Sequence, residues 1–292
     1  MFEFLKAKAA RLFGAPPEGY GVRPPATPRE HLHAAWVAAG GPAQLGEEYA
    51  SFVERHGADA LDLVNARTIH YYWLRQLGQL TNEFKIDLVI DGGANTGQYA
   101  STLLGFSGYR GEVHSYEPLS EEFAVMKQYE SHYGGWRMFN MAIGDFDGEA
   151  EIVINGEVSS LLQKTEMLDR LTGGAKPERK EKVAVRRLDT LYCEVLADLS
   201  RRVMLKLDVQ GFEERALRSA GKYLGAFKLV QIELSGVALY NGDMRIPRAM
   251  SLLEDAGFTL IYCKNNFSIR GTVTVDFDFI FCRRSEFDAM QA

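Results

Sequence analysis

The 292-residue sequence predicts an α/β fold in which a doubly wound, mostly parallel sheet follows a helical N-terminal extension. One observation is that short apolar segments typical of buried strands alternate with helix-like segments, as in parallel sheets. Another is a glycine-rich turn directly after the first of these strands. The last is a pair of C-terminal segments, Phe258 to Cys263 and Thr274 to Cys282, which suit a hairpin that adds one antiparallel strand.

Residues 1–80 are expected to form the helical extension, and residues 81–292 the α/β domain. Apolar residues recur at helical spacing from Pro28 to Leu80, after a segment rich in proline and glycine, Gly14 to Pro28, that we interpret as a linker or an extended strap across the domain. An extension of this length would struggle to bury its large aromatic residues alone. We therefore expect a lid and assembly element that packs on the α/β domain and on a second subunit, which predicts a homodimer.

The first thirteen residues suit an amphipathic helix with Phe2, Leu5 and Phe13 on one side. Two interpretations stay open: peripheral docking on a membrane surface, or packing on the chain's own domain or a partner subunit. We favour packing because the segment is short and lightly charged. No window approaches the roughly 20 apolar residues of a spanning helix, and no cleavable signal follows the N-terminus. These observations predict a soluble, cytoplasmic protein.

Charge and cysteine content argue against several kinds of partner. The formal net charge is -6 with acidic and basic residues interspersed, so the chain lacks the basic stripe that nucleic-acid binding usually needs. Cys193, Cys263 and Cys282 are far apart and lack C-x-x-C spacing. We therefore expect no nucleic-acid partner, no disulfide framework and no zinc site.

The glycine-rich turn runs from Asp91 to Gly97 and reads DGGANTG. It follows the strand-like run Leu88-Val89-Ile90 and precedes a helical segment from Tyr99 to Phe106. Glycines allow dihedrals and close backbone approaches that a Cβ forbids, and free N–H groups at the helix start would face a ligand. The spacing departs from the dinucleotide fingerprint G-x-G-x-x-G. The turn therefore predicts a nucleotide-type site, with pyrophosphate not the favoured ligand.

A second acid supports this site. Glu117 ends the next predicted strand, Glu112 to Glu117, about 26 residues after Asp91, near the place where a carboxylate accepts hydrogen bonds from ribose hydroxyls in doubly wound folds. The alternative is an ordinary turn between strand and helix with an exposed glutamate.

The remaining elements follow in order. We expect a helix Glu121 to His132, a strand Trp136 to Ala142, a hairpin return arm Glu149 to Asn155, a strand Val183 to Arg187, a strand Arg202 to Asp208, a helix Glu213 to Tyr223, a strand Lys228 to Leu234 and a helix Arg248 to Ala256. Between them, Glu157 to Lys182 breaks the pattern and ends in a charged run. We interpret it as a mobile flap with a solvated end.

Charged side chains gather on two later strands. Lys206 and Asp208 share a face of one strand because side chains alternate with period two, and Asp208 lies at its carboxyl end, where open α/β sheets bind ligands. A buried lysine needs a partner. We expect that partner among three acids: Asp208, Glu213 and Glu233. The alternative is a structural ion pair that only fixes the loop.

Glu233 near the end of the following strand would bring a second carboxylate to the same edge. Two carboxylates there could directly remove the proton of a hydroxyl group on a bound acceptor molecule. They could instead hold a divalent cation that lowers the pKa of that hydroxyl, an alternative that stays open but is not favoured.

Five segments together resemble the FkbM family of methyltransferases, over Ile86 to Arg283. They are VIDGGANTG from Val89, YEP from Tyr116, RLDTL from Arg187, KLDVQGFE from Lys206 and QIEL from Gln231. The resemblance implies a class I, Rossmann-like fold with a seven-stranded sheet and a methyltransferase that uses S-adenosyl-L-methionine (SAM). The acceptor would be a hydroxyl of a small molecule or glycan, such as a sugar, a polyketide or another secondary metabolite. Gly92 departs from the family pattern, in which a bulkier residue is frequent.

The resemblance also implies roles for residues. SAM would be held by the turn, the acid after it and neighbouring positions, which are Asp91, Gly92, Gly93, Asn95, Gly97, Tyr99, Glu117, Pro118, Ala142 and Ile143. Lys206, Asp208 and Glu233 would lie beside the transferred methyl group and act in catalysis. Two other functions stay open: a catalytically silent SAM-fold module that binds a partner, which the paired acids argue against, and a nucleotide-dependent oxidoreductase.

Overall fold

A computed structural model describes residues 73, 75–154, 159–172, 179–198, 200–269 and 273–290. The chain divides into two units, Met1–Gln76 and Leu77–Ala292, and nearly all described residues belong to the second. The linker, the amphipathic helix and most of the lid predicted within residues 1–80 lie outside the described residues. Their roles, and the homodimer inferred from them, stay predictions.

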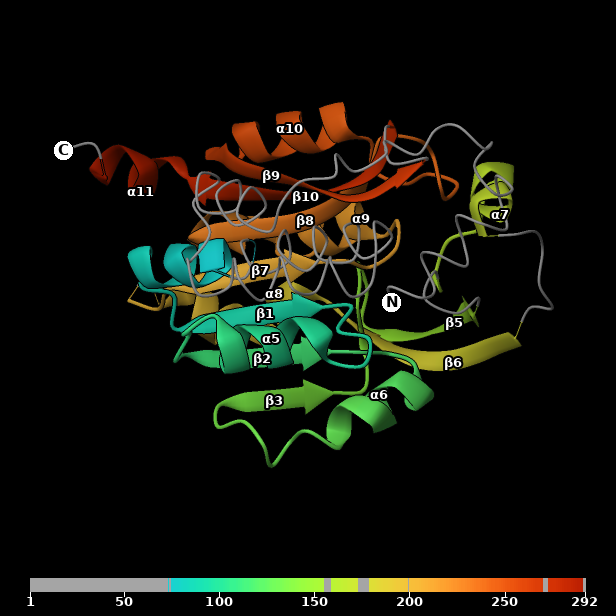
Figure 1. Ribbon diagram of the computed structural model, residues 1–292, viewed down its shortest axis with the longest axis horizontal. Helices are drawn as coiled ribbons and strands as arrows, with labels where there is room; N and C mark the ends of the chain where they lie inside the picture. Colours follow the sequence, from blue (N-terminus) through green and yellow to red (C-terminus); the bar gives the residue numbers. More distant parts are fainter. Residues whose placement is uncertain are drawn as a thin grey trace, which may run out of the picture. The chain divides into compact units, whose positions relative to one another are not determined.

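The main sheet has seven strands in the order β3-β2-β1-β7-β8-β10-β9 (Figure 1). The third strand in this order is β1 (Leu88–Gly92), which is buried along its whole length. β1 pairs in parallel with β2 (Glu112–Tyr116) on one side and with β7 (Val203–Leu207) on the other. The apolar run that predicted a buried strand therefore lies inside the sheet, between two parallel neighbours.

Four further strands complete the sheet. β3 (Trp136–Phe139) and β8 (Leu229–Ser235) extend the parallel part on either side. β10 (Val273–Arg283) runs antiparallel to both β8 and β9 (Phe258–Ile269). This arrangement confirms the predicted seven-stranded, mostly parallel sheet with a terminal hairpin as its antiparallel part.

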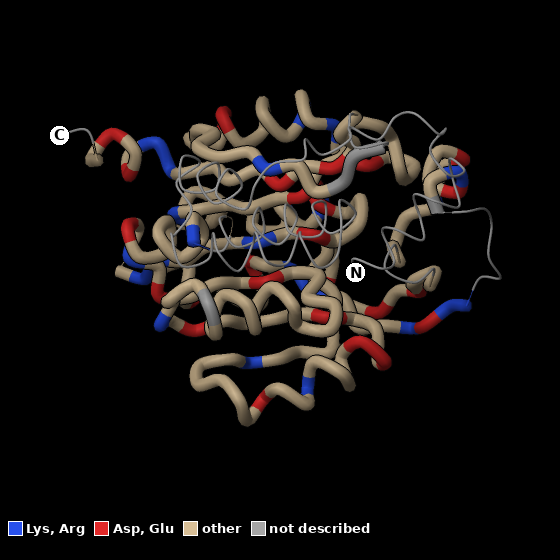
Figure 2. The backbone as a smooth tube through the Cα atoms, viewed as in Figure 1, with Lys and Arg blue, Asp and Glu red and all other residues tan. Residues whose placement is uncertain are grey.

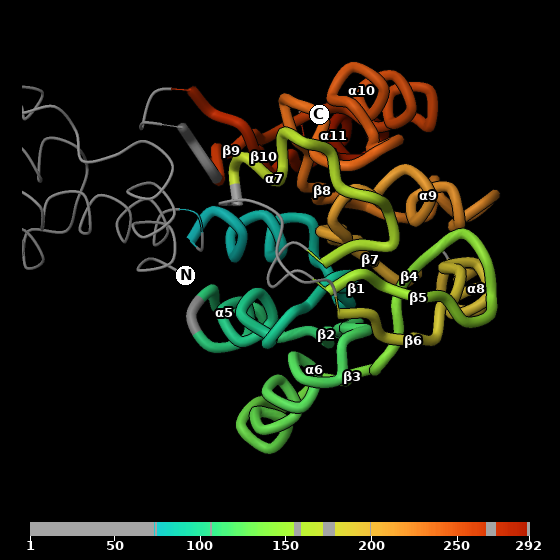
Figure 3. The backbone as a smooth tube through the Cα atoms, turned by 90° about the vertical axis from the view of Figure 1, so that its right-hand side faces the viewer, coloured from blue at the N-terminus to red at the C-terminus, as the bar shows by residue number. Residues whose placement is uncertain are grey.

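Helices cover both faces of this sheet (Figure 3). One face carries α5 (Gln98–Phe106) and α6 (Ser120–Lys127). The other carries three helices: α8 (Leu188–Ala197), α9 (Glu213–Arg218) and α10 (Ile246–Asp255). None of the helices in the described part of the chain is long and apolar enough to cross a membrane.

The largest apolar core lies between α8, α9, α10 and the sheet. Its members are buried side chains of these helices and of the central strands, among them Leu188, Leu205, Leu217, Ile232 and Leu253.

The helices differ from the prediction in several places. α8 was not predicted, and Tyr192 within it has non-helical dihedrals (φ -128°, ψ 16°). Two predicted helices are too long, because α6 ends at Lys127 and α9 gives way to a 3₁₀ helix (Gly221–Ala226). A short helix, α11 (Arg284–Ala289), follows the last strand.

A second sheet of three strands lies beside the first, in the order β4-β6-β5. It contains β4 (Ala142–Ile143), β5 (Gly148–Ile154) and β6 (Arg179–Arg186). The single strand predicted for 136–142 is wrong, because β3 and β4 belong to different sheets. Asn140 between them donates its side-chain amide to the carbonyl oxygens of Glu117 (3.0 Å) and Pro118 (2.9 Å), which holds the chain where it leaves the main sheet.

The interpretation of residues 149–182 also needs correction. β5 is not the return arm of a hairpin with the preceding strand, because it pairs antiparallel with β6. The charged run begins β6 instead of ending a solvated flap, and Figure 2 shows basic and acidic residues alternating there. Lys180 pairs with Glu151 (2.7 Å) and Lys182 with Glu149 (2.5 Å). Cross-strand pairs of opposite charge allow a highly charged sequence to form a strand.

The first described part of the predicted flap, residues 159–172, contains a helix that sequence reasoning missed. α7 (Glu166–Thr172) buries Leu168 and Leu171 against Leu239 and Tyr240. The backbone N–H of Thr165 donates to the carbonyl oxygen of Leu239 (2.9 Å). These contacts attach the segment to the loop after β8.

Candidate functional site

The loops after β1, β2 and β7 meet at the carboxyl edge of the main sheet, toward which the arrowheads of these strands point in Figure 1. They line a pocket of about 710 Å³, part of which is open solvent. Seven residues predicted for the site line the pocket: Gly93, Asn95, Glu117, Pro118, Ala142, Ile143 and Asp208.

The other six predicted residues lie outside the lining of this pocket: Asp91, Gly92, Gly97, Tyr99, Lys206 and Glu233. Tyr99 points to the neighbouring strands, where its hydroxyl donates to Gln231 Oε1 (2.9 Å) and its ring centroid lies 5.3 Å from Lys206 Nζ. The site therefore has a layer of residues that face the pocket and a layer behind it.

The glycines of the turn serve contacts within the protein. Gly93 has a φ of 77°, and a Cβ there would lie 1.8 Å from the carbonyl oxygen of Asp208. A Cβ on Gly97, which has a φ of 85°, would lie 2.7 Å from the Trp136 ring. The N–H groups of Asn95 and Thr96 already have acceptors, Glu117 Oε2 (2.7 Å) and Asn95 Oδ1 (2.6 Å). The expectation that they are free to face a ligand was wrong for these two positions.

Glu117 is a buried carboxylate on the pocket wall. Its Oε2 accepts the N–H of Asn95 (2.7 Å) and its Oε1 accepts the N–H of Leu119 (2.8 Å). Burial raises its pKa to about 7, against the lowering effect of these two hydrogen bonds. A carboxylate has about four acceptor positions, so two remain for donors of a ligand.

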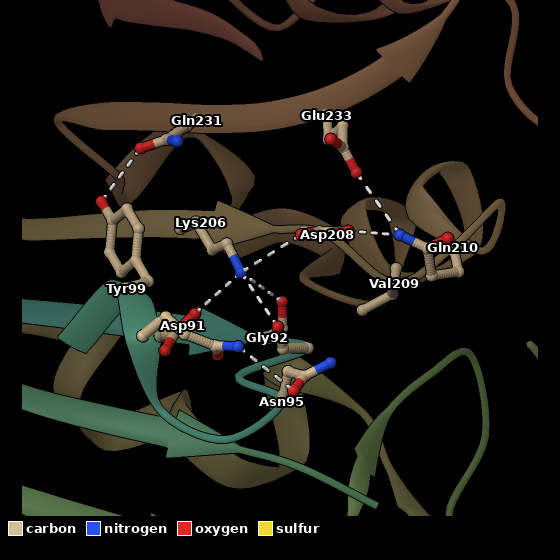
Figure 4. Close-up of polar contacts among 12 residues, drawn as sticks. Asp91, Gly92, Asn95, Tyr99, Lys206, Asp208, Val209, Gln210, Gln231 and Glu233 are labelled. Atoms are coloured by element: carbon tan, nitrogen blue, oxygen red, sulfur yellow. Dashed lines mark hydrogen bonds and ion pairs between the residues drawn. The ribbon is translucent and has the colours of Figure 1, made fainter. Parts of the chain in front are cut away.

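Lys206 and Asp91 form the buried ion pair behind the pocket (Figure 4). Lys206 Nζ lies 3.0 Å from Asp91 Oδ1 and 3.8 Å from Asp208 Oδ2, and it donates to the carbonyl oxygen of Gly93 (3.0 Å). Asp91 is fully buried and also accepts the hydroxyl of Ser115 (2.9 Å). Lys206 therefore has the partner that its burial requires, but the nearest acid is Asp91, which was not among the three predicted partners.

Lys206 keeps its positive charge. Burial lowers the pKa of Lys206, but the charges of Asp91 and Asp208 raise it further, so the net shift is upward. Asp91 and Lys206 are direct neighbours in the register of β1 and β7. The alternation of side chains along a strand does not show which residue of the neighbouring strand lies opposite. Asp91 was therefore missed as the partner of Lys206.

Asp208 and Glu233 are joined through Gln210 (Figure 4). Gln210 Nε2 donates to Asp208 Oδ1 (2.8 Å) and to Glu233 Oε2 (3.4 Å). Asn266 Nδ2 donates to the other oxygen of Glu233 (2.9 Å). Burial, and then the charge of Asp208, raise the pKa of Glu233 well above its usual range. The pair of acids therefore retains a proton at a pH where isolated carboxyl groups are ionised.

Gln210 is the central residue that sequence reasoning missed. It has a φ of 52°, unusual for a residue other than glycine and frequent at functional sites. Its Oε1 accepts the hydroxyl of Tyr240 (2.9 Å) and its carbonyl oxygen that of Ser160 (2.6 Å). Its amide nitrogen therefore faces the two acids and its amide oxygen faces Tyr240. The sequence offered one signal for this residue, which is a glutamine directly before a glycine, Gly211, just after a predicted strand.

A doubly wound, seven-stranded sheet with this strand order and an acid-lined pocket at its carboxyl edge is a class I methyltransferase fold. The Methyltransferase FkbM domain family matches residues 91–260, more than half of the chain. The chain belongs to this family, as the resemblance of its motifs predicted. No curated protein matches the sequence.

Several solved methyltransferase structures are similar at low identity. Magnesium protoporphyrin IX methyltransferase from Synechocystis PCC 6803 with bound SAM is 12% identical, with a TM-score of 0.41 over 75% of this chain and 81% of that chain. Fibrillarin from Aeropyrum pernix with natively bound SAM is 11% identical, with a TM-score of 0.38 over 67% and 66%. The 1,6-didemethyltoxoflavin-N1-methyltransferase from Burkholderia thailandensis is 14% identical, with a TM-score of 0.38 over 89% and 92%.

Proposed function

We propose that the chain transfers a methyl group from SAM to a hydroxyl of a small molecule or glycan. Family membership supports methyl transfer. The observation that carries the choice of a hydroxyl is the acid pair Asp208 and Glu233, bridged by Gln210 at the pocket. A hydroxyl group must lose its proton when its oxygen is methylated, and a proton acceptor held at the site meets this need.

The residues of the pocket fit SAM as a cofactor. Glu117 has acceptor positions for the two ribose hydroxyls, and Leu119, Ala142 and Ile143 provide apolar surface for a purine ring. Asp208 places a carboxylate where a cationic ligand is favoured. When bound, SAM supplies a methyl group on a positively charged sulfur.

The chain's own residues would orient the acceptor and take up its proton. Asp208 lines the pocket with a side chain that is 34% exposed, so it can contact an acceptor hydroxyl. Glu233, with its raised pKa, can share the proton with Asp208. Lys206 is 6% exposed and bound to Asp91 and the Gly93 carbonyl, so we assign it the positioning of the loops after β1 and β7.

We assign Asp91 the same positioning role as Lys206. It is fully buried behind the turn, so it would act on SAM through Lys206 and the backbone of Gly93. Within the described ranges, no group of three or more His, Cys, Asp or Glu side chains is placed to hold a metal ion. We propose proton transfer to the acid pair as the route for this chain because Asp208 lines the pocket and Gln210 joins it to Glu233.

The remaining parts of the proposal rest on the sequence. Interspersed charge and the net charge of -6 favour a small-molecule or glycan acceptor over a nucleic acid. A cytoplasmic homodimer, assembled through residues 1–80, completes the proposal. Sedimentation of the full chain tests the dimer, and a monomer at all concentrations would contradict it.

Methyl transfer to oxygen is tested with SAM carrying a ¹³C-labelled methyl group and a panel of sugars, glycosides and polyketide alcohols, each matched with its amino analogue. We expect the label on oxygen, identified by NMR of the product. Label found on nitrogen alone would contradict the assignment of a hydroxyl acceptor.

A further inference from the structure

The pocket contains a carboxylate that the proposed reaction leaves without a role. Glu122, in the first turn of α6, lines the pocket together with Glu117, Pro118 and Leu119. Its Oε2 atom is buried and has no hydrogen-bond partner among the described residues. Buried acceptors in native proteins are nearly always satisfied, so an exception points to a donor that binds there.

The surroundings of Glu122 define what kind of donor fits. Leu119, Ala142 and Ile152 belong to one apolar cluster, against which Leu161 packs, and all four line the pocket. An apolar surface that lies in the same pocket as an unpaired hydrogen-bond acceptor suits a flat heteroaromatic ring that carries an N–H group on its edge. A hydroxyl-rich ligand would leave most of its polar groups unpaired on this surface.

Two other polar side chains nearby, those of Asn140 and Glu121, are already occupied. Asn140 uses its side-chain amide on the carbonyl oxygens of Glu117 and Pro118. Glu121, the neighbour of Glu122 on α6, accepts a hydrogen bond from Arg179 (2.7 Å) outside the lining of the pocket. Glu122 is therefore the carboxylate of α6 that faces the pocket with an acceptor to spare.

We infer that Glu122 is a specificity-determining residue that accepts a hydrogen bond from the 6-amino group of the adenine of SAM. This inference rests on the proposed function, because it takes SAM as the cofactor. Glu117 would hold the ribose, while Glu122, five residues later in the sequence, would distinguish adenine from purines that lack the amino group. The two acids would thus read different parts of one ligand.

The inference is tested by calorimetry on the full chain with S-adenosylhomocysteine (SAH) and S-inosylhomocysteine, in which an oxygen replaces the 6-amino group. The parent should bind SAH at least about tenfold more tightly, because a charge-assisted hydrogen bond is lost and an oxygen faces the carboxylate. Glu122→Ala should weaken SAH about tenfold and leave the two ligands within about threefold of each other. Glu122→Gln should also lose the preference, since its amide can donate as well as accept.

Glu121→Ala is the matched control and should keep both affinities of the parent. Thermal unfolding of the ligand-free variants shows whether each one folds, and removal of an acceptor without a partner should leave Glu122→Ala as stable as the parent. A parental preference retained in Glu122→Ala would overturn the inference, as would equal weakening of both ligands. Failure of the parent to bind SAH at all would instead remove the proposed function, and the inference with it.

Discussion

At the scale of single residues, the buried pair of Lys206 and Asp91 gives the first prediction. Asp91→Ala would leave the Lys206 ammonium group in a site where it is 6% exposed and without its nearest counter-charge. Loss of one partner of a buried pair costs roughly 3–5 kcal/mol. We expect the free energy of unfolding in urea to fall by about this amount.

Asp87→Ala is a suitable control for this experiment. Asp87 pairs with Arg201 at 2.9 Å, but its side chain is 42% exposed, and exposed ion pairs contribute at most about 1 kcal/mol. An equally small effect of both substitutions would show that the Lys206 pair is not the buried contact described above.

Glu213 makes stability depend on pH. It is 4% exposed and accepts the N–H groups of Val209 (3.1 Å) and Gly211 (3.0 Å). Burial raises its pKa from 4.5 to about 7, so the folded state binds the proton more tightly than the unfolded state. Its contribution is therefore complete below pH 4.5 and is lost as pH rises to about 7, by at most about 3 kcal/mol.

Glu213→Gln tests this linkage because it removes the titration and keeps the shape. We expect the slope of unfolding free energy against pH between 4.5 and 7 to become flatter than in the parent. Glu117 is expected to contribute a slope of the same sign, since burial also raises its pKa to about 7. An unchanged slope in Glu213→Gln would assign the pH dependence to other groups.

Asp208 and Gln210 are expected to affect turnover more than cofactor affinity. Asp208→Asn removes the carboxylate that contacts the pocket, and Gln210→Leu removes the bridge to Glu233. Loss of a general base costs roughly 100-fold or more in rate. With an acceptor from the labelled-methyl screen, we expect such a loss for Asp208→Asn, a smaller one for Gln210→Leu, and SAH affinities within about threefold of the parent. Parental turnover in Asp208→Asn would remove it from the reaction.

At the scale of elements, alternation of strands and helices was sufficient to predict the main sheet and its carboxyl-edge site. Apolar runs such as Leu88–Ile90 identify buried strands because a parallel sheet is covered on both faces. Which strands pair, and in which register, could not be predicted from this alternation. The contact of Asp91 with Lys206 depends on the register of β1 and β7, and the second sheet depends on β4 meeting β6 some 40 residues later in the chain.

Part of the candidate site was predicted for the same reason, and part was missed. Glu117 and Asp208 end strands, so their place on the pocket wall follows from topology. Gln210 and Tyr240 come from loops after different strands, and their hydrogen bond depends on loop conformations that periodicity does not describe. The strand predicted from Val183 to Arg187 missed the charged start of β6, where opposite charges pair with β5.

The α7 segment gives a prediction at this scale. Leu168 is 2% exposed and packs against the loop after β8, whereas its neighbour Met167 is 38% exposed. Leu168→Ala should loosen the attachment of residues 159–172, because truncation of a buried leucine costs about 2–5 kcal/mol where the site cannot collapse. We expect faster cleavage within this segment in limited proteolysis than for Met167→Ala. Equal cleavage rates would show that the apolar contacts do not hold the segment.

At the scale of the whole molecule, the sheet and its covering helices bring three sequence motifs to one pocket. The turn after β1, the acid after β2 and the Lys206 to Glu213 segment contact one another through Gly93, Asn95 and Asp208. These contacts link the two carboxylate groups of the proposed function, Glu117 for the cofactor and Asp208 for the acceptor. Binding of SAM in this pocket is the claim on which the rest of the proposal depends.

Calorimetric titration of the full chain with SAM, SAH and NAD tests this claim most directly. We expect SAM and SAH to bind with micromolar affinity and NAD not to bind, because the pocket offers acids to ribose and sulfonium and none of the described residues that line it is basic and could hold a pyrophosphate. Glu117→Ala should weaken SAM by roughly 10-fold to 100-fold, as expected for lost hydrogen bonds to a charged group. Tight binding of NAD, or SAM affinity unchanged in Glu117→Ala, would contradict the account.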